Sequence, residues 1–238
     1  MGRELESVLA AAEVLHQYTA VAASNGNKVH SALGNLKDAR FALSLFQHHD
    51  AITGTASDNV VHDYAEQMHA GLASAWTVLT NSAEVALSQG KGPLSLQPLA
   101  QRQGPMDLPA QNVIQLTSAH MVELVSFNSG PRESTTLLRV IVDTDTVCMK
   151  DDSGRFVSVQ LNPVISTQPG LRFVEDQFEV VLPVTIKAFG LAVTRLVHEP
   201  SCAAPEKSSV FDSQQQIPAG FTTGNAAPAG QVMRASKV

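Results

Sequence analysis

The chain has 238 residues, of which 44% are hydrophobic, 5% aromatic and 16% charged. This length suits one large domain or two small ones, and the apolar content suffices for a buried core. The net charge of −6 argues against nucleic acid as a partner, because phosphate binding requires a basic patch. The sequence has no apolar window long enough to span a membrane, and acidic residues in its first segment exclude a signal peptide.

Residues 1–88 have the apolar periodicity of helices. An apolar stripe at three- and four-residue steps predicts a first helix from its N-terminus; the stripe consists of Leu5, Val8, Leu9, Ala12 and Leu15. The turn-forming Asn25-Gly26-Asn27 and Gly34 then interrupt the pattern. A second helix is predicted from Leu36 to Gln47.

A third, longer helix is predicted to begin near Asp58. Thr55 and Asp58 resemble a capping box, with a hydroxyl for the free backbone N–H groups and an acid in the first turn. The apolar face of this helix comprises Val61, Tyr64, Met68, Leu72, Ala75, Leu79 and Ala86. Three helices joined by short connections favour an antiparallel bundle over residues 1–88.

The second half of the chain predicts a β-domain. Residues 89–116 contain prolines and no period, which is typical of a linker. From residue 117 to 200 about six short β-rich runs alternate with turn residues, which favours an antiparallel β-sandwich-like domain. A hairpin turn is predicted at Asp151–Gly154. Residues 201–238 are poor in aliphatic residues, and we expect them to form a disordered tail.

The two cysteines do not define a disulfide framework. Cys148 lies in a strand-like run and Cys202 in the predicted tail, which favours two unpaired thiols although a pair is possible.

The stretch FQHHDAITGTASD, from Phe46 to Asp58, places His48, His49 and Asp50 side by side. Imidazole is a common zinc ligand and a carboxylate is a good hydroxyl acceptor. On a regular helix these neighbours would point about 100° apart, so only a helix end could bring them together. A full zinc site needs three or four ligands, and no standard ligand pattern is present. Judged by residues alone, exposed or hydrogen-bonded histidines at a helix end are the simpler interpretation.

Other candidate side chains lie on the third predicted helix. His62 and His69 are seven residues apart and share a face, but no second carboxylate completes a metal set, so we interpret them as helix-surface residues. Tyr64, Met68 and Trp76 favour core or interface positions rather than ligand contacts.

The ten residues Phe46–Thr55 resemble the signature of family 38 glycoside hydrolases, the class II α-mannosidases. The Phe before Gln and the ending AITGT resemble the Golgi type (α-mannosidases II and IIx) more than the lysosomal type. The flanking stretches RELESVLAAAEVLHQY and DNVVHDYAEQMHAGL resemble helices of the family's middle domain. Two later stretches, starting at Val122 and Phe178, resemble the first strands of its β-domain, so the resemblance spans roughly residues 3–198.

The resemblance implies an α+β multidomain fold: an antiparallel three-helix bundle followed by an antiparallel β-sandwich-like domain. It implies a zinc-dependent retaining α-mannosidase that hydrolyses α-mannosyl linkages in N-glycan processing, in the Golgi lumen or at its membrane. Matched to the signature, His49 coordinates the zinc and Asp50 contacts mannose hydroxyls. His48 has no ligand role in that pattern, and we expect it to pack or form hydrogen bonds.

The resemblance also implies that the catalytic carboxylates lie elsewhere. Retaining chemistry uses two carboxyl groups about 5 Å apart, a nucleophile and an acid/base. In the family these, and the remaining zinc ligands, belong to an α/β barrel that would precede Met1. We therefore expect no catalytic residue in this chain, an inactive isolated chain, and two partners: the catalytic barrel and a mannose-containing N-glycan. The alternative is a non-catalytic bundle and β-domain that binds a partner or a glycan.

Overall fold

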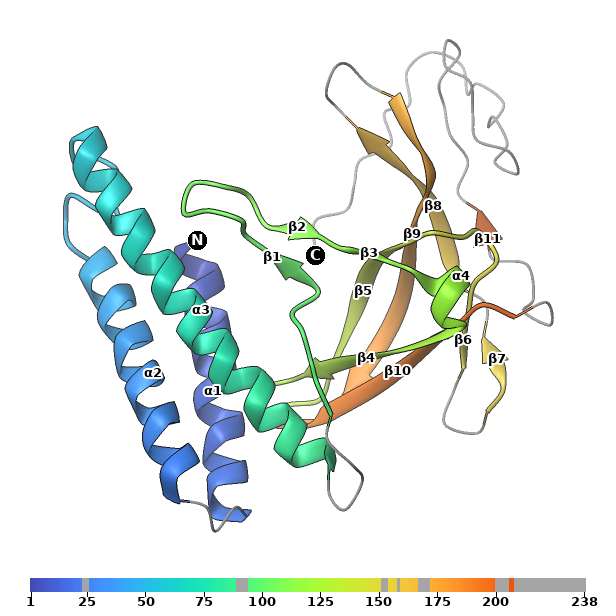
Figure 1. Cartoon of the computed structure of the whole chain (residues 1–238), viewed down its shortest axis with the longest axis horizontal. Helices are drawn as coiled ribbons and strands as arrows, with labels where there is room; N and C mark the ends of the chain where they lie inside the picture. The colour runs from blue at the N-terminus through green and yellow to red at the C-terminus, as the bar shows by residue number, and fades with distance from the viewer. Residues whose placement is uncertain are drawn as a thin grey trace. The chain divides into compact units, whose positions relative to one another are not determined.

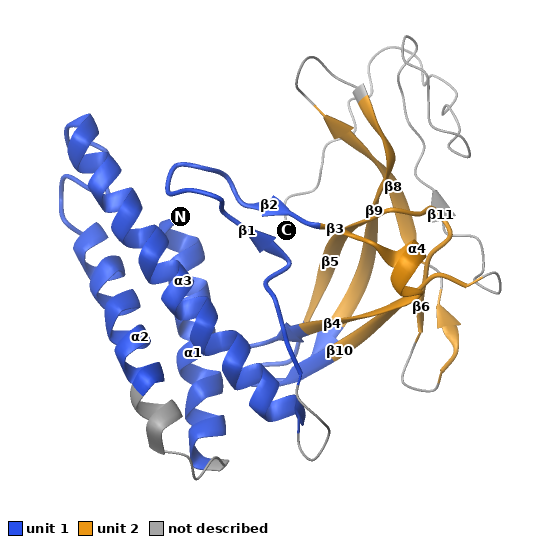
Figure 2. Cartoon of the chain, in the orientation of Figure 1, with its two compact units in different colours: residues 1–112, 126–134, 185–192 blue, residues 113–125, 135–184, 193–238 orange. Residues whose placement is uncertain are grey.

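The structure is a computed structural model of the whole chain, and Figure 2 shows its two compact units. Unit 1 comprises residues 1–112, 126–134 and 185–192, and unit 2 comprises residues 113–125, 135–184 and 193–238. No helix in the described part of the chain is long and apolar enough to cross a membrane. The described residues are 1–22, 26–88, 94–150, 154–157, 159–166, 172–199 and 206–207.

Three helices form the antiparallel bundle of unit 1: α1 (Gly2–Ala22), α2 (Gly26–Phe46) and α3 (Asp58–Ser88) (Figure 1). The predicted bundle and the predicted start of α3 are confirmed. The predicted start of α2 at Leu36 is wrong, because the helix begins at Gly26 and runs through Gly34. A Cβ atom on Gly34 would meet nothing within 4 Å, so no close contact requires glycine here. Gly34 destabilises α2 only through the low intrinsic helix propensity of glycine.

The core of the bundle consists of small and aliphatic side chains from all three helices. Gly71 of α3 marks a close approach to α2: a Cβ atom there would lie 2.8 Å from Cβ of Ala42 and 3.3 Å from Cα of Ala39. The predicted stripes of α1 and α3 supply most of the rest. The buried cluster comprises Leu5, Val8, Leu9, Ala12, Leu36, Ala39, Ala42, Met68, Leu72, Ala75 and Val78.

The segment after α3 was predicted to be a linker, and its described part carries a small hairpin. Strands β1 (Ala100–Gln101) and β2 (Ala110–Gln111) pair in antiparallel fashion. Arg102 anchors this hairpin to α1, because its Nε and Nη2 atoms lie 2.8 and 2.7 Å from Oε2 of Glu4. Arg102 also donates to the carbonyl of Asp107 across the hairpin loop. An ion pair that is largely sheltered from water therefore holds the segment in place.

Two sheets and one short helix follow among the described residues. A four-stranded sheet has the order β4-β10-β6-β7, and a five-stranded sheet has the order β11-β8-β9-β5-β3 (Figure 1). The elements are β3 (Val113–Ile114), α4 (Leu116–Ala119), β4 (Met121–Phe127), β5 (Ser134–Val142), β6 (Cys148–Lys150), β7 (Phe156–Val157), β8 (Gln160–Ser166), β9 (Arg172–Ile186), β10 (Leu191–Val197) and β11 (Glu206–Lys207).

The strand pairing confirms the predicted fold class, and it shows two parallel pairings that the sequence did not indicate. β8 pairs antiparallel with β9, and β6 pairs antiparallel with β7 in the predicted hairpin; Asp151–Ser153 of its turn lie outside the described residues. The outer strands β3 and β11 instead pair in parallel with β5 and β8. β11 is the described part of the predicted tail, and the rest of that tail lies outside the described residues.

Unit 2 has a core of its own, to which both sheets contribute. Val140, Leu161 and Val180 of the larger sheet and Cys148 and Leu196 of the smaller sheet are all fully buried.

Cys148 is disulfide-bonded, so the expectation of unpaired thiols is wrong. That expectation came from the local sequence, which cannot show what the tertiary fold brings next to a buried strand. The chain's other cysteine, Cys202, lies outside the described residues.

Asp143 holds the start of the short helix α4. Its Oδ1 atom accepts the N–H groups of Leu116 and Thr117 at 2.8 and 3.1 Å, and its Oδ2 atom accepts the Thr117 hydroxyl. Burial by itself raises the pKa of Asp143, but these hydrogen bonds favour the carboxylate and lower the pKa below its ordinary 3.8.

Candidate functional site

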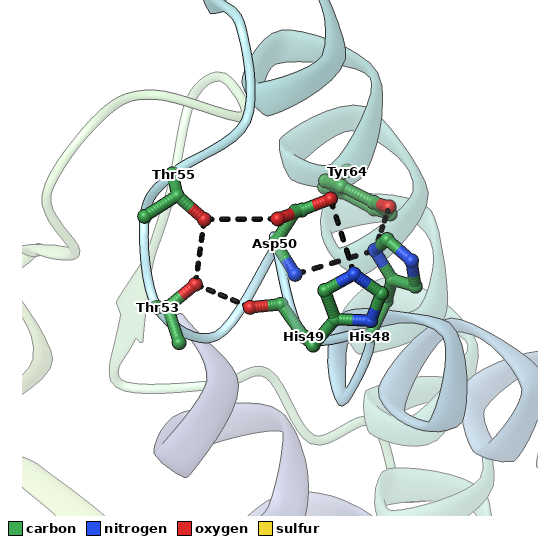
Figure 3. Close-up of polar contacts among 6 residues, drawn as sticks. All are labelled: His48, His49, Asp50, Thr53, Thr55 and Tyr64. Atoms are coloured by element: carbon green, nitrogen blue, oxygen red, sulfur yellow. Dashed lines mark hydrogen bonds and ion pairs between the residues drawn. The ribbon is translucent and has the colours of Figure 1, made fainter.

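The candidate site is the loop of residues 47–57 between α2 and α3, which folds back on itself through its own backbone (Figure 3). The carbonyl of Asp50 accepts the N–H groups of both Thr55 and Ala56 at 3.1 Å. Gly54 has a φ of +70°, a left-handed conformation that other residues adopt reluctantly. This turn brings Thr55 back beside Asp50, so the loop has a defined shape although it lies on the surface.

The loop gathers the three consecutive side chains His48, His49 and Asp50. Each offers one potential ligand atom, and these atoms lie within 4.8 Å of one another. Among the described residues, this is the one group of three or more metal-ligating side chains. A regular helix would have spread them around its axis, so their convergence depends on the helix ending at Phe46.

His49 and Asp50 form the open part of the group. Nε2 of His49 lies 3.5 Å from Oδ2 of Asp50, and the two side chains are 83% and 47% exposed. Two ligand atoms that bind one tetrahedral zinc at about 2.1 Å each would lie roughly 3.4 Å apart. The separation therefore suits two ligand atoms that bind one ion or one molecule. Both atoms can be reached from solvent.

Two threonines orient Asp50 and the loop around it (Figure 3). The Thr55 hydroxyl donates to Oδ1 of Asp50 at 3.0 Å, and Oγ1 of Thr53 lies 2.9 Å from Oγ1 of Thr55. Thr53 also donates to the carbonyl of His49. With Oδ1 occupied by Thr55, Oδ2 is the carboxylate oxygen turned toward His49.

His48 is held differently from its neighbour. Its Nδ1 atom accepts the backbone N–H of Asp50 at 3.4 Å and lies 3.2 Å from the hydroxyl of Tyr64. The prediction that His48 packs or forms hydrogen bonds is confirmed.

Sequence reasoning missed the contact of Tyr64 and misplaced the role of Thr55. The Thr55 hydroxyl contacts Asp50 rather than capping α3, whose first backbone hydrogen bonds go to the carbonyl of Ser57. For Thr55 a signal existed in the sequence, because Thr53-Gly54-Thr55 is typical of a turn, and a turn there brings Thr55 back toward Asp50. For Tyr64 none did, because its partner lies 16 residues away.

The other histidines of α3 do not join this group. His62 forms an ion pair with Glu66 one helical turn along, with Nε2 and Oε1 3.1 Å apart, and it is exposed as predicted. Nε2 of His69 lies 3.4 Å from the carbonyl of Arg102, so this side chain sits under the hairpin and is only partly exposed. Trp76 packs partly buried against the bundle core, as predicted.

Comparison with known proteins identifies the family of the chain. Residues 1–85 match the α-mannosidase middle domain. The chain is 33% identical to human α-mannosidase 2 over 213 residues, or 84% of its length. The chain belongs to the α-mannosidase family. The match includes the whole candidate loop, and it confirms the family that the signature FQHHDAITGT indicated.

The comparisons also favour one branch of the α-mannosidases. Mouse α-mannosidase 2x is 32% identical over 82% of the chain, whereas mouse lysosomal α-mannosidase is 27% identical over 76%. This order agrees with the resemblance of the signature to the II and IIx type. The chain spans about a fifth of the curated relatives it matches, 18% of human α-mannosidase 2 and 18% of mouse α-mannosidase 2x.

Proposed function

We propose that this chain supplies one wall of the active site of a zinc-dependent, retaining α-mannosidase that acts on N-glycans in the Golgi. In this proposal His49 is a zinc ligand and Asp50 accepts hydroxyl groups of the bound mannose. The observation that carries it is the exposed pair of Nε2 of His49 and Oδ2 of Asp50, 3.5 Å apart, within a loop that matches the family signature.

The residues present fit part of a zinc site. A catalytic zinc needs three protein ligands or more. Of the group His48, His49 and Asp50, this proposal assigns one to zinc, His49, because Nδ1 of His48 is already engaged and Asp50 is assigned to the sugar. The remaining ligands would come from outside this loop. When bound, zinc would hold sugar hydroxyls and act as a Lewis acid.

Asp50 is suited to binding a sugar because its carboxylate is oriented before any ligand arrives. Thr55 occupies Oδ1, and Oδ2 remains for a hydroxyl donor next to His49. A pre-oriented acceptor loses less rotational freedom when it binds, so its hydrogen bond contributes more to affinity. The role of Asp50 is therefore recognition rather than bond cleavage, and the nucleophile and the acid/base carboxylate are not assigned to this chain.

Zinc binding can be tested by titrating the full chain with Zn²⁺ and following the histidine ring signals by NMR. We expect weak binding that perturbs the His49 ring and is lost in His49→Ala. The matched control is His62→Ala, which removes an exposed histidine of α3 outside the loop. If zinc binds the chain but His49→Ala binds it equally well, the assignment of His49 is wrong.

Activity can be tested with an aryl α-mannoside and the isolated chain. We expect no turnover with or without added Zn²⁺, because the two carboxyl groups of retaining chemistry are not assigned to this chain. Zinc-dependent turnover would contradict the proposal that the chain is only one wall of the active site.

A further inference from the structure

Tyr64 is the one residue outside the loop drawn in contact with the group of ligand atoms (Figure 3). It comes from α3, and its phenol oxygen lies 3.2 Å from Nδ1 of His48. The ring centroids of Tyr64 and His48 are 6.4 Å apart, so the phenol lies beside the imidazole and reaches it with its hydroxyl. A residue predicted to lie in the core or at an interface thus reaches the site.

The two contacts of Nδ1 favour one tautomer of His48. The backbone N–H of Asp50 can only donate, so Nδ1 of His48 accepts from it. Nδ1 has one lone pair in the ring plane, so the Asp50 N–H at 3.4 Å and the Tyr64 hydroxyl at 3.2 Å share it, and the neutral ring then holds its hydrogen on Nε2. Because the contact with the backbone N–H is long, the shorter contact with Tyr64 contributes most to this tautomer. In this form neither nitrogen has a free lone pair for a metal ion.

Without these contacts, His48 and His49 would compete closely to bind the same metal ion. Their ring centroids are only 4.3 Å apart, and both side chains are exposed. Nε2 of His49 faces the carboxylate of Asp50. His48 differs from His49 by its contacts with the Tyr64 hydroxyl and with the Asp50 N–H.

We propose that Tyr64 is a positioning residue of this site: it holds His48 as a hydrogen-bond acceptor, which fixes the backbone at Asp50 and leaves His49 as the imidazole available to a metal ion. Asp50 is then held from two directions, by His48 through its main-chain N–H and by Thr55 through its carboxylate. The part of this inference that concerns metal choice rests on the proposed function, and the part that concerns the backbone does not.

The first experiment compares Tyr64→Phe with the wild-type full chain, without metal, by NMR of the histidine ring nitrogens. In the wild type we expect the His48 signals of an unprotonated Nδ1 and a protonated Nε2. In Tyr64→Phe we expect a shift toward a mixture of the two tautomers. The matched control is Tyr18→Phe, which alters the other tyrosine of the chain, a residue of α1 beside Phe189. An unchanged His48 signal in Tyr64→Phe would overturn the proposal.

A second pair of variants tests the backbone contact directly. In His48→Asn the amide oxygen can replace Nδ1 as an acceptor, whereas His48→Ala removes the acceptor. We expect the amide resonance of Asp50 to stay near its wild-type position in His48→Asn and to lose its hydrogen-bonded shift in His48→Ala. If His48→Ala leaves this resonance in place, His48 does not position Asp50.

Addition of Zn²⁺ alone to the same samples separates the inference from the proposed function. We expect zinc to perturb His49 but not His48 in the wild type, and both rings in Tyr64→Phe. If zinc selects His49 equally in both proteins, the role of Tyr64 in metal choice is refuted. If zinc perturbs neither ring in the wild type, the zinc role of His49 fails, while the metal-free comparison still decides whether Tyr64 positions His48.

Discussion

The three-helix bundle and the loop that joins α2 to α3 are neighbours in sequence, yet different forces hold them. The bundle packs apolar side chains so closely that Gly71 leaves no room for a Cβ atom. The loop instead exposes its key side chains and relies on hydrogen bonds that involve Thr55, His48 and Tyr64. Changes in the bundle should therefore affect folding first, and changes in the loop should affect the site while the fold persists.

The largest effect is expected from Gly71→Val. The new side chain would start 2.8 Å from Cβ of Ala42 and 3.3 Å from the backbone of Ala39, so α2 and α3 must move apart. Overpacking of this kind costs about 3 kcal/mol in free energy of unfolding, measurable by thermal or chemical denaturation followed by circular dichroism. The control is Gly34→Ala, which meets no atoms within 4 Å and should stabilise α2 by roughly 0.5–1 kcal/mol. Equal effects at the two glycines would show that close packing does not dominate in the bundle.

A smaller loss is expected from Arg102→Met, which tests whether a polar contact can matter within unit 1. The side chains of Arg102 and Glu4 are only 10% and 25% exposed, so the variant leaves a sheltered carboxylate without its partner. We expect a loss of about 2 kcal/mol in the free energy of unfolding. A buried charged acceptor left without a hydrogen-bond partner destabilises the fold by more than the net contribution of the hydrogen bond.

The control for Arg102→Met is Arg40→Met, which breaks the exposed pair with Glu13 and should cost less than about 1 kcal/mol. In the double variant Glu4→Gln with Arg102→Met, part of the loss should be recovered. If Arg102→Met and Arg40→Met lower the free energy of unfolding equally, burial does not strengthen the ion pair of Arg102 with Glu4.

The two regions also differ in how far the sequence alone predicted them. Apolar periodicity found the bundle because its helices bury one regular face, and an acidic residue in the first turn marked the start of α3 at Asp58. The beginning of α2 was missed because the helix runs through Gly34 despite the poor helix propensity of glycine.

Within the site, local sequence and the family signature pointed to His48, His49 and Asp50, and the structure brings these residues together. The contact of Tyr64 with His48 could not be predicted, because it depends on how α3 packs beside the end of α2. The disulfide bond of Cys148 was missed for the same reason, since spacing along a chain does not define proximity in space.

Asp143 tests whether a hydrogen-bonded carboxylate also contributes to stability in unit 2. Its pKa is lowered in the folded state, so it stabilises the fold above the unfolded value of 3.8, and this contribution is lost as the pH falls through the lower folded value. We expect the wild type to lose this stability in that acidic range. Asp143→Asn should lack this pH-dependent component, and at neutral pH it should cost about 1 kcal/mol, typical of a lost helix cap. Parallel stability curves for the two proteins below pH 3.8 would contradict the anchoring role.

The smallest effect on stability is expected from Thr55→Val. This variant also tests most directly whether the loop can change while the bundle stays folded. The substitution keeps the shape of the side chain and removes the hydroxyl that donates to Oδ1 of Asp50 in an exposed loop. Asp50 can then rotate into water, so the free energy of unfolding should change by less than about 1 kcal/mol. The Asp50 carboxylate should nevertheless lose its fixed orientation, which NMR of the side-chain carboxyl carbon can detect. Thr55→Ser retains the hydroxyl and should keep the wild-type signal. A Thr55→Val variant that unfolds the bundle would show that the loop contributes to folding and is not only a support for the site.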